Sequence, residues 1–177
     1  MTIPVIETPR LRLRAHRSAD LPDCVDLWSD PLVTKYISGR ASTEHQTWMR
    51  LLSYAGLWAL VGFGYWAIEE KSSNGFAGEV GFADFKREGA TPLGGNPELG
   101  FVIASPLHGK GYATEAVGAA LAWADAHLPS GTVCMVSRAN YASRRVVEKC
   151  GYKVFERSIF REQPVLFLAR ESGASTA

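Results

Sequence analysis

Residues 98–115 read ELGFVIASPLHGKGYATE, and they contain the clearest strand–turn–helix pattern of the chain. Its first part, 98–104, is short and apolar with β-branched side chains, so it predicts a buried strand that ends before Pro106. Gly109 and Gly111 follow, and because they lack a Cβ they let backbone N–H groups approach a ligand closely. An apolar stripe at helical spacing comes next: Ala113, Ala116, Val117, Ala120, Leu121, Ala124 and Leu128. The free N–H groups and positive dipole end of such a helix suit an anion, most commonly a phosphate.

Two common phosphate-binding motifs do not fit this turn. A P-loop requires GxxxxGK followed by Ser or Thr, whereas Lys110 lies between two glycines and Gly111 leads into Tyr-Ala-Thr. A dinucleotide fingerprint requires a small residue where Thr114 stands, and an acidic residue about twenty positions further on at the end of a second strand. Both classes are therefore rejected.

The turn resembles the pyrophosphate loop of the GNAT acetyltransferases, whose pattern is Gln/Arg-x-x-Gly-x-Gly/Ala. Residues 108–113, HGKGYA, fit that pattern with His108 in the place of Gln or Arg. The longer string GKGYATEA at 109–116 resembles the RimJ/RimL-type branch in particular. Further blocks resemble the same branch in the same order: TPRLRLR at 8–14, Trp28 through Tyr36, and the N-x-x-S and E-K-x-G-Y elements within 140–152. The resemblance thus covers nearly the whole chain.

The patterns of apolar and turn residues predict an α/β chain of the α+β class, in the order β-α-α-β-β-β-α-β-α-β-β. The resemblance implies the GNAT fold, a mixed and mostly antiparallel central sheet of about seven strands, splayed at the central strand, with helices on both faces. We expect a single domain over residues 1–170 and a disordered tail over 171–177. The predicted strands cover 10–15, 64–70, 76–86, 98–104, 133–137, 153–159 and 164–169. The predicted helices begin at Ser18 or Asp20, at Thr43, after Gly111 and at Asn140.

The composition is that of an ordinary soluble globular protein, with 46% hydrophobic and 21% charged residues. The net charge is +1 without a basic tract, which argues against nucleic acid as a partner because phosphate-backbone binding needs clustered Lys and Arg. The three cysteines and four histidines are scattered, so we predict no metal site, no disulfide framework and a cytoplasmic location. The N-terminus lacks a signal-peptide pattern, and the uncharged stretch 54–68 is too short for a membrane span.

The resemblance implies acetyl-CoA as the cosubstrate. The pyrophosphate would lie on the N–H groups of residues 109–114, and the pantetheine arm would pair with the backbone of residues 101–103 like an added strand. Asn140 would bond to that arm, and Ser143 would lie near the CoA sulfur. His108 could reach a phosphate oxygen, although we expect it to point to solvent. The predicted cofactor-binding residues are Phe101, Val102, Ile103, His108, Gly109, Lys110, Gly111, Tyr112, Ala113, Thr114, Asn140 and Ser143.

Acetyl transfer to an amine needs a deprotonated amine, a donor for the developing oxyanion and a proton for the leaving thiolate. Glu98, at the start of the central strand, is the predicted base, and Glu79 is the second choice. The alternative for Glu98 is a solvated side chain or one paired to an arginine. Ser143 is the candidate proton donor, since Val147 stands where many relatives have a tyrosine. Asn140 and Ser143 could equally form no more than a helix cap.

The predicted acceptor is a primary amine. Our first hypothesis is a protein or peptide α-amine, and the second is a small amine such as a polyamine, an aminoglycoside or an amino-acid-like metabolite. A non-catalytic acyl-CoA-binding sensor domain is the third. A tight acidic pocket would favour a polyamine or an aminoglycoside, whereas a shallow open groove would favour a peptide. Relatives commonly form homodimers, but nothing in this sequence indicates one.

Overall fold

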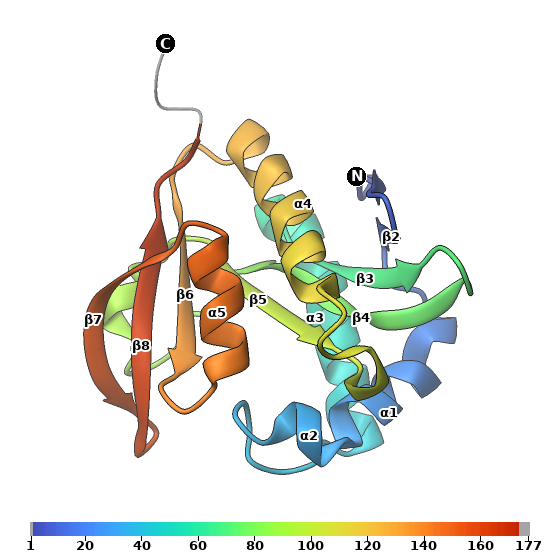
Figure 1. The fold of residues 1–177 in the computed structure, drawn as a ribbon, viewed down its shortest axis with the longest axis horizontal. Helices are drawn as coiled ribbons and strands as arrows, with labels where there is room; N and C mark the ends of the chain where they lie inside the picture. Colours follow the sequence, from blue (N-terminus) through green and yellow to red (C-terminus); the bar gives the residue numbers. More distant parts are fainter. Residues whose placement is uncertain (1, 174–177) are drawn as a thin grey trace.

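The computed structural model describes residues 2–173. In this part of the chain, eight strands form one sheet, and helices cover both of its faces (Figure 1). The strands are β1 Ile6–Glu7, β2 Leu11–Arg14, β3 Tyr65–Glu70, β4 Gly75–Ala83, β5 Glu98–Ile103, β6 Thr132–Ser137, β7 Lys153–Phe160 and β8 Gln163–Arg170. The α-helices are α1 Leu21–Ser29, α2 Pro31–Thr34, α3 Glu44–Val61, α4 Tyr112–His127 and α5 Tyr141–Lys149.

The strand order is β1-β2-β3-β4-β5-β6-β8-β7, and every neighbouring pair is antiparallel except β5 and β6. Strand β5 pairs with β4 along its whole length, from Glu98 to Ile103. Towards β6 it makes a single register pair, Glu98 with Val133. Beyond this pair the two strands diverge, as Figure 1 shows for the arrowheads of β5 and β6. The predicted splay at the central strand is confirmed.

Two layers of helices enclose the sheet. Helix α4, with Val147 of α5, packs on one face in a large apolar core that includes Leu11, Phe82 and Leu99. Helices α1 and α2 pack on the other face around Val102. Helix α3 covers the same second face through Tyr54, which stacks on Tyr65, and its Trp58 packs in the large apolar core. Burial of these apolar surfaces is the main force that holds the layers together.

Local sequence signals explain several element boundaries. Thr43 caps α3 through a hydrogen bond from the N–H of Gln46, and the Gln46 side chain returns a bond to the Thr43 N–H. Asn74 adopts a left-handed conformation, φ 53°, in the turn between β3 and β4, as the Asn-Gly pair predicts. Asn140 caps α5 by accepting a bond from the N–H of Ser143.

The eight strands exceed the expected seven by the two-residue strand β1, which is too short to leave an alternating pattern in the sequence. No helix within residues 2–173 is long and apolar enough to cross a membrane. The predicted tail begins at Glu171, and the N–H of Gly173 donates to Asp125 Oδ1 at 3.1 Å. Residues 174–177 of that predicted tail lie outside the described residues.

Candidate active site

The divergence of β5 and β6 leaves one side of the central strand without a neighbouring strand. Phe101, Val102 and Ile103 pair with Val80, Glu79 and Gly78 of β4, and none of the three pairs with β6. An extended group could therefore add to this side of β5 by strand-like pairing, because no strand occupies it. The carbonyl of Ile103 on this side already lies 2.8 Å from His108 Nε2. The family resemblance predicts the pantetheine arm at this gap.

The glycine turn lies at the beginning of α4, a helix of 16 residues. Gly109 and Gly111 have φ angles of 76° and 82°, in the left-handed region that favours glycine. Among the described residues, no backbone N–H from Gly109 to Thr114 donates a hydrogen bond to the protein. A continuous row of free donors at the positive end of a helix suits a pyrophosphate.

A brace from the N-terminal segment holds this turn. Glu115 accepts bonds from the Thr8 hydroxyl at 2.6 Å and from Arg10, through its N–H at 2.9 Å and its Nε at 2.6 Å. Arg10 Nη1 in turn donates to the carbonyl of Lys110 at 2.8 Å. Burial alone would raise the pKa of Glu115, but the bonds from Thr8 and Arg10 outweigh it and lower the pKa. The carboxylate therefore stays charged and fixes the turn relative to β2.

We expected the His108 side chain to point to solvent, but in the structure it contacts the backbone. Its Nε2 lies 2.8 Å from the carbonyl oxygen of Ile103, although the residue as a whole is exposed. The bond ties the turn back to the end of β5. His108 therefore stabilises the geometry between the strand and the glycine turn in this structure.

Asn140 and Ser143 lie at the N-terminus of α5. The Asn140 side-chain oxygen is used in the cap, and Ser143 is half-buried with its amide 3.1 Å from that oxygen. Val147 is fully buried in the main core. An apolar side chain therefore fills the position at which the resemblance would have a tyrosine. Neither nearby tyrosine replaces it directly: the Tyr152 hydroxyl bonds to Thr132, and Tyr141 is 69% exposed.

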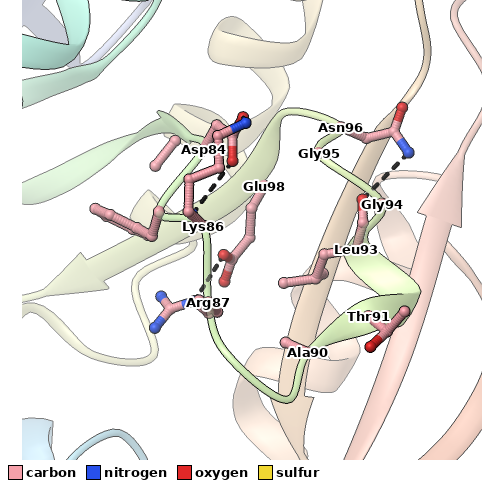
Figure 2. A pocket seen from close by; sticks show the side chains of 12 residues that line it. Asp84, Lys86, Arg87, Ala90, Thr91, Leu93, Gly94, Gly95, Asn96 and Glu98 are labelled. Atoms are coloured by element: carbon pink, nitrogen blue, oxygen red, sulfur yellow. Dashed lines mark hydrogen bonds and ion pairs between the residues drawn. The ribbon is translucent and has the colours of Figure 1, made fainter.

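Glu98 lies on the opposite side of β5 from α4, at the wall of a cavity of about 230 Å³ (Figure 2). Its carboxylate is nearly buried, and Oε2 accepts a bond from Arg87 Nε at 2.8 Å. The loop between β4 and β5 forms the rest of the wall. The alternative in which Glu98 pairs with an arginine is therefore present. The Glu98 carboxylate also lines a cavity that could admit a small ligand.

Tyr65 places a hydroxyl group over the central strand. A Cβ built on Gly100 would overlap this hydroxyl, so the glycine makes room for it. By strand alternation Glu98, Gly100 and Val102 share one face, which puts the hydroxyl between Glu98 and Val102. Burial, followed by the charge of Glu98, raises the pKa of Tyr65. Tyr65 therefore keeps its proton at neutral pH and can act as a hydrogen-bond donor.

Glu79, the second candidate base, is fully buried beneath α1 and α3. Its Oε2 accepts bonds from Trp28 Nε1 at 3.1 Å and from the Tyr54 hydroxyl at 2.9 Å, and its Oε1 lies 3.5 Å from His16 Nε2. Ligand-type atoms of His16, Cys24 and Glu79 lie within 4.8 Å of one another. This environment holds the carboxylate inside the protein, where it orients Trp28 beside Val102.

The sequence reasoning missed Arg10, Arg87 and Tyr65. Arg10 stood within a block used for the family resemblance, so its proximity to the turn could have been suspected. Arg87 precedes Glu98 by eleven positions in a loop without regular periodicity, and no spacing signal connects the two. Tyr65 meets Gly100 across two strand pairings, a contact that only the register of the sheet defines.

Comparisons with known proteins identify the family of this chain. Residues 10–153 match the family model described as the acetyltransferase (GNAT) domain. The uncharacterized protein YkkB of Bacillus subtilis (strain 168) is 30% identical over 150 residues, which cover 81% of this chain and 82% of YkkB.

Solved structures show the same fold. The crystal structure of an acetyltransferase from Agrobacterium tumefaciens str. C58 is 27% identical with a TM-score of 0.79, covering 96% of this chain and 95% of that one. RimL, a ribosomal L7/L12 α-N-protein acetyltransferase solved with coenzyme A, has a TM-score of 0.76 at 16% identity, covering 97% of this chain and all of RimL (100%). By the family model and by the relative YkkB, this chain belongs to the GNAT acetyltransferase family.

Proposed function

We propose that this GNAT acetyltransferase uses acetyl-CoA to acetylate a primary amine, by direct attack of the amine in a ternary complex. The row of free N–H donors from Gly109 to Thr114 carries the cofactor part of this proposal. The unpaired side of β5 supports a place for the pantetheine arm, and the structurally similar RimL binds coenzyme A. On this proposal the remaining predicted contacts, Lys110, Tyr112, Ala113 and Asn140, surround the same cofactor.

The demand on a catalytic base depends on the acceptor. An α-amine with a pKa near 8 is about one-tenth deprotonated at pH 7, so freeing it costs about 1.4 kcal/mol. A lysine amine with a pKa near 10.4 would cost about 4.6 kcal/mol. The α-amine needs only modest assistance, which a carboxylate could give through a water molecule.

We assign the base to Glu98, because its carboxylate faces the cavity at the acceptor side of β5. The bond from Arg87 to Oε2 orients the Glu98 side chain, and Oε1 has no hydrogen-bond partner among the described residues, so it can bind a water or an amine. A backbone N–H of β5 near Val102 would donate to the carbonyl oxygen that gains charge during attack. The hydroxyl of Ser143 would supply the proton for the leaving thiolate, since Val147 offers none.

The cavity favours a small acceptor over a long peptide. Its volume of about 230 Å³ lies below the range of roughly 300–1,000 Å³ that is usual for drug-sized ligands. Its charged residues are mixed in sign, Asp84 and Glu98 with Lys86 and Arg87, so it is not the acidic pocket that a polyamine would need. RimL acts on a protein α-amine, and a protein N-terminus therefore stays as the second candidate acceptor.

One substitution tests the cofactor part. Gly111→Val forces a β-branched residue into a left-handed conformation, with its Cβ 3.4 Å from Arg10 Nη2. We expect the affinity for acetyl-CoA, measured by isothermal titration calorimetry, to fall at least about tenfold. Gly118→Ala is the matched control, because Gly118 lies inside α4 and a Cβ there meets nothing within 4 Å. Equal affinities of the two folded variants would reject the assignment of the pyrophosphate to this turn.

A turnover assay separates the enzyme from the sensor. Release of CoA thiol would be measured against peptides, polyamines, aminoglycosides and free amino acids. Turnover with any class supports the enzyme. Tight binding of acetyl-CoA without turnover on the whole panel would favour the non-catalytic alternative.

A further inference from the structure

We propose that Arg87 is the specificity residue of the acceptor site and binds an anionic group of the acceptor. The acceptor is then a small amine that carries a carboxylate beside its amino group, that is, a free amino acid or an amino-acid-like metabolite. This inference rests on the proposed acetyl transfer and names the acceptor for the same site.

The guanidinium of Arg87 is only partly used by the protein. Among residues 2–173 its hydrogen bond runs through Nε alone, to Glu98 Oε2. Figure 2 shows the two terminal nitrogens on the side away from Glu98, and the side chain is 30% exposed. Four N–H donors in a planar fork therefore remain, which is the arrangement that binds a carboxylate through two parallel bonds.

Two contacts hold the fork in place. The guanidinium carbon lies 4.8 Å from the centre of the Phe85 ring, so the aromatic face supports the charged group. Glu98 fixes the Nε edge, and its own side chain is only 9% exposed. A long and otherwise flexible side chain is thus pre-organised before any ligand arrives, which lowers the entropic cost of binding.

The charge pattern of the site matches a zwitterion. Arg87 and Glu98 offer one positive and one negative group side by side, and an amino acid brings one of each in return. The other charged pair on the cavity wall, Lys86 and Asp84, is joined at 2.5 Å and is neutral as a unit. A polyamine would bring several positive charges towards Arg87, and like charges repel in a partly buried site. A peptide N-terminus lacks the carboxylate on its first residue.

The position of Glu98 connects this recognition to the reaction. Glu98, Gly100 and Val102 follow one another along the same face of β5, and the Tyr65 hydroxyl lies over Gly100. An amine held near Glu98 would therefore lie between this carboxylate and the Tyr65 hydroxyl. Strand β5 thus connects Glu98, which Arg87 contacts, to Val102, near which we place the acetyl group.

Matched substrates give the sharpest test. Each common L-amino acid would be assayed beside its α-amide, which keeps the side chain and the amine and resembles a peptide N-terminus but has no carboxylate. The proteins would be the unaltered chain, Arg87→Gln, Arg87→Lys and the control Arg157→Gln, which removes an exposed arginine on β7. We expect at least one amino acid to exceed its amide in kcat/KM by about tenfold or more.

The variants separate recognition from chemistry. Arg87→Gln should raise KM for the amino acid about tenfold or more and bring acid and amide close together, with Arg87→Lys in between. The control should keep the full preference. A preference for the amide, for a polyamine or for a peptide would overturn the inference and leave acetyl transfer intact, as would a preference for the acid that Arg87→Gln does not change.

Ligand binding gives a readout that does not need turnover. Saturation-transfer NMR of the same amino acids, with the protein saturated with CoA, should show contact that Arg87→Gln abolishes. Such contact without turnover would support the recognition by Arg87 while rejecting the proposed enzyme. Absence of both contact and turnover, with CoA binding intact, would overturn both.

Discussion

The buried carboxylate of Glu79 permits a quantitative prediction about what holds α1 and α3 on the sheet. It is wholly inaccessible, and its Oε2 accepts bonds from Trp28 and Tyr54. A buried hydrogen-bonding group that loses its partner costs about 1–3 kcal/mol. Glu79→Leu removes both bonds and leaves the two donors unpaired in the interior. We expect it to lower the free energy of unfolding by about 2–5 kcal/mol, a large part of the 5–15 kcal/mol typical of a whole domain.

A double-mutant cycle isolates one of these bonds. Tyr54→Phe alone should cost about 1–3 kcal/mol, because it removes the hydroxyl that donates to Glu79 at 2.9 Å. In the Glu79→Leu background the same change should cost nothing or increase the stability, since it removes a buried hydroxyl that has lost its acceptor. The coupling energy should therefore reach about 1 kcal/mol or more.

Urea unfolding followed by tryptophan fluorescence and by circular dichroism would measure the four proteins, with coincident transitions as the check on two-state behaviour. Glu156→Leu, on the exposed strand β7, is the matched control and should change stability by no more than about 0.5 kcal/mol. Additive losses for Tyr54→Phe and Glu79→Leu, within about 0.5 kcal/mol, would refute the reasoning.

Because Glu79 orients Trp28 beside Val102, the less disruptive Glu79→Gln should raise the acceptor KM without changing the affinity for acetyl-CoA.

Three further outcomes follow from the same geometry. Glu115→Gln loosens the brace from Arg10, and we expect acetyl-CoA to bind several-fold more weakly in calorimetry; unaltered affinity would show that the brace has no role in holding the turn. Ser143→Ala should lower kcat with little change in either KM, and an unchanged kcat would remove Ser143 as proton donor. Burial would raise the pKa of Asp20, but hydrogen bonds from Arg14 and from the Arg17 backbone lower it on balance. The contribution of Asp20 to the stability of the fold is therefore complete above the unfolded pKa of about 3.9, and it is lost as pH falls through the lower folded pKa. In acid titrations Asp20→Asn should therefore be less stable than the unaltered chain near neutral pH and lose this difference at low pH; a constant difference would contradict the pKa assignment.

Local sequence patterns are sufficient to predict the short-range features of this fold. The strand that starts at Glu98, the turn at Gly109 and Gly111 and the helix after it are short-range features, because a left-handed φ, a helix N-terminus and an apolar stripe depend on neighbouring residues. The helix caps at Thr43 and Asn140 are of the same kind. The family motifs lie in these local segments, which is why the fold could be named before the structure was known.

The arrangement of residues on the acceptor side depends on long-range contacts. Arg87 meets Glu98 because the loop between β4 and β5 folds back over the strand, and Tyr65 reaches Gly100 through the register of β3, β4 and β5. The expectation for His108 failed for the same reason, since its partner is a carbonyl brought near by the end of β5. Such contacts depend on strand order and on a one-residue register that no local pattern encodes, because a slip by one position turns every side chain to the other face.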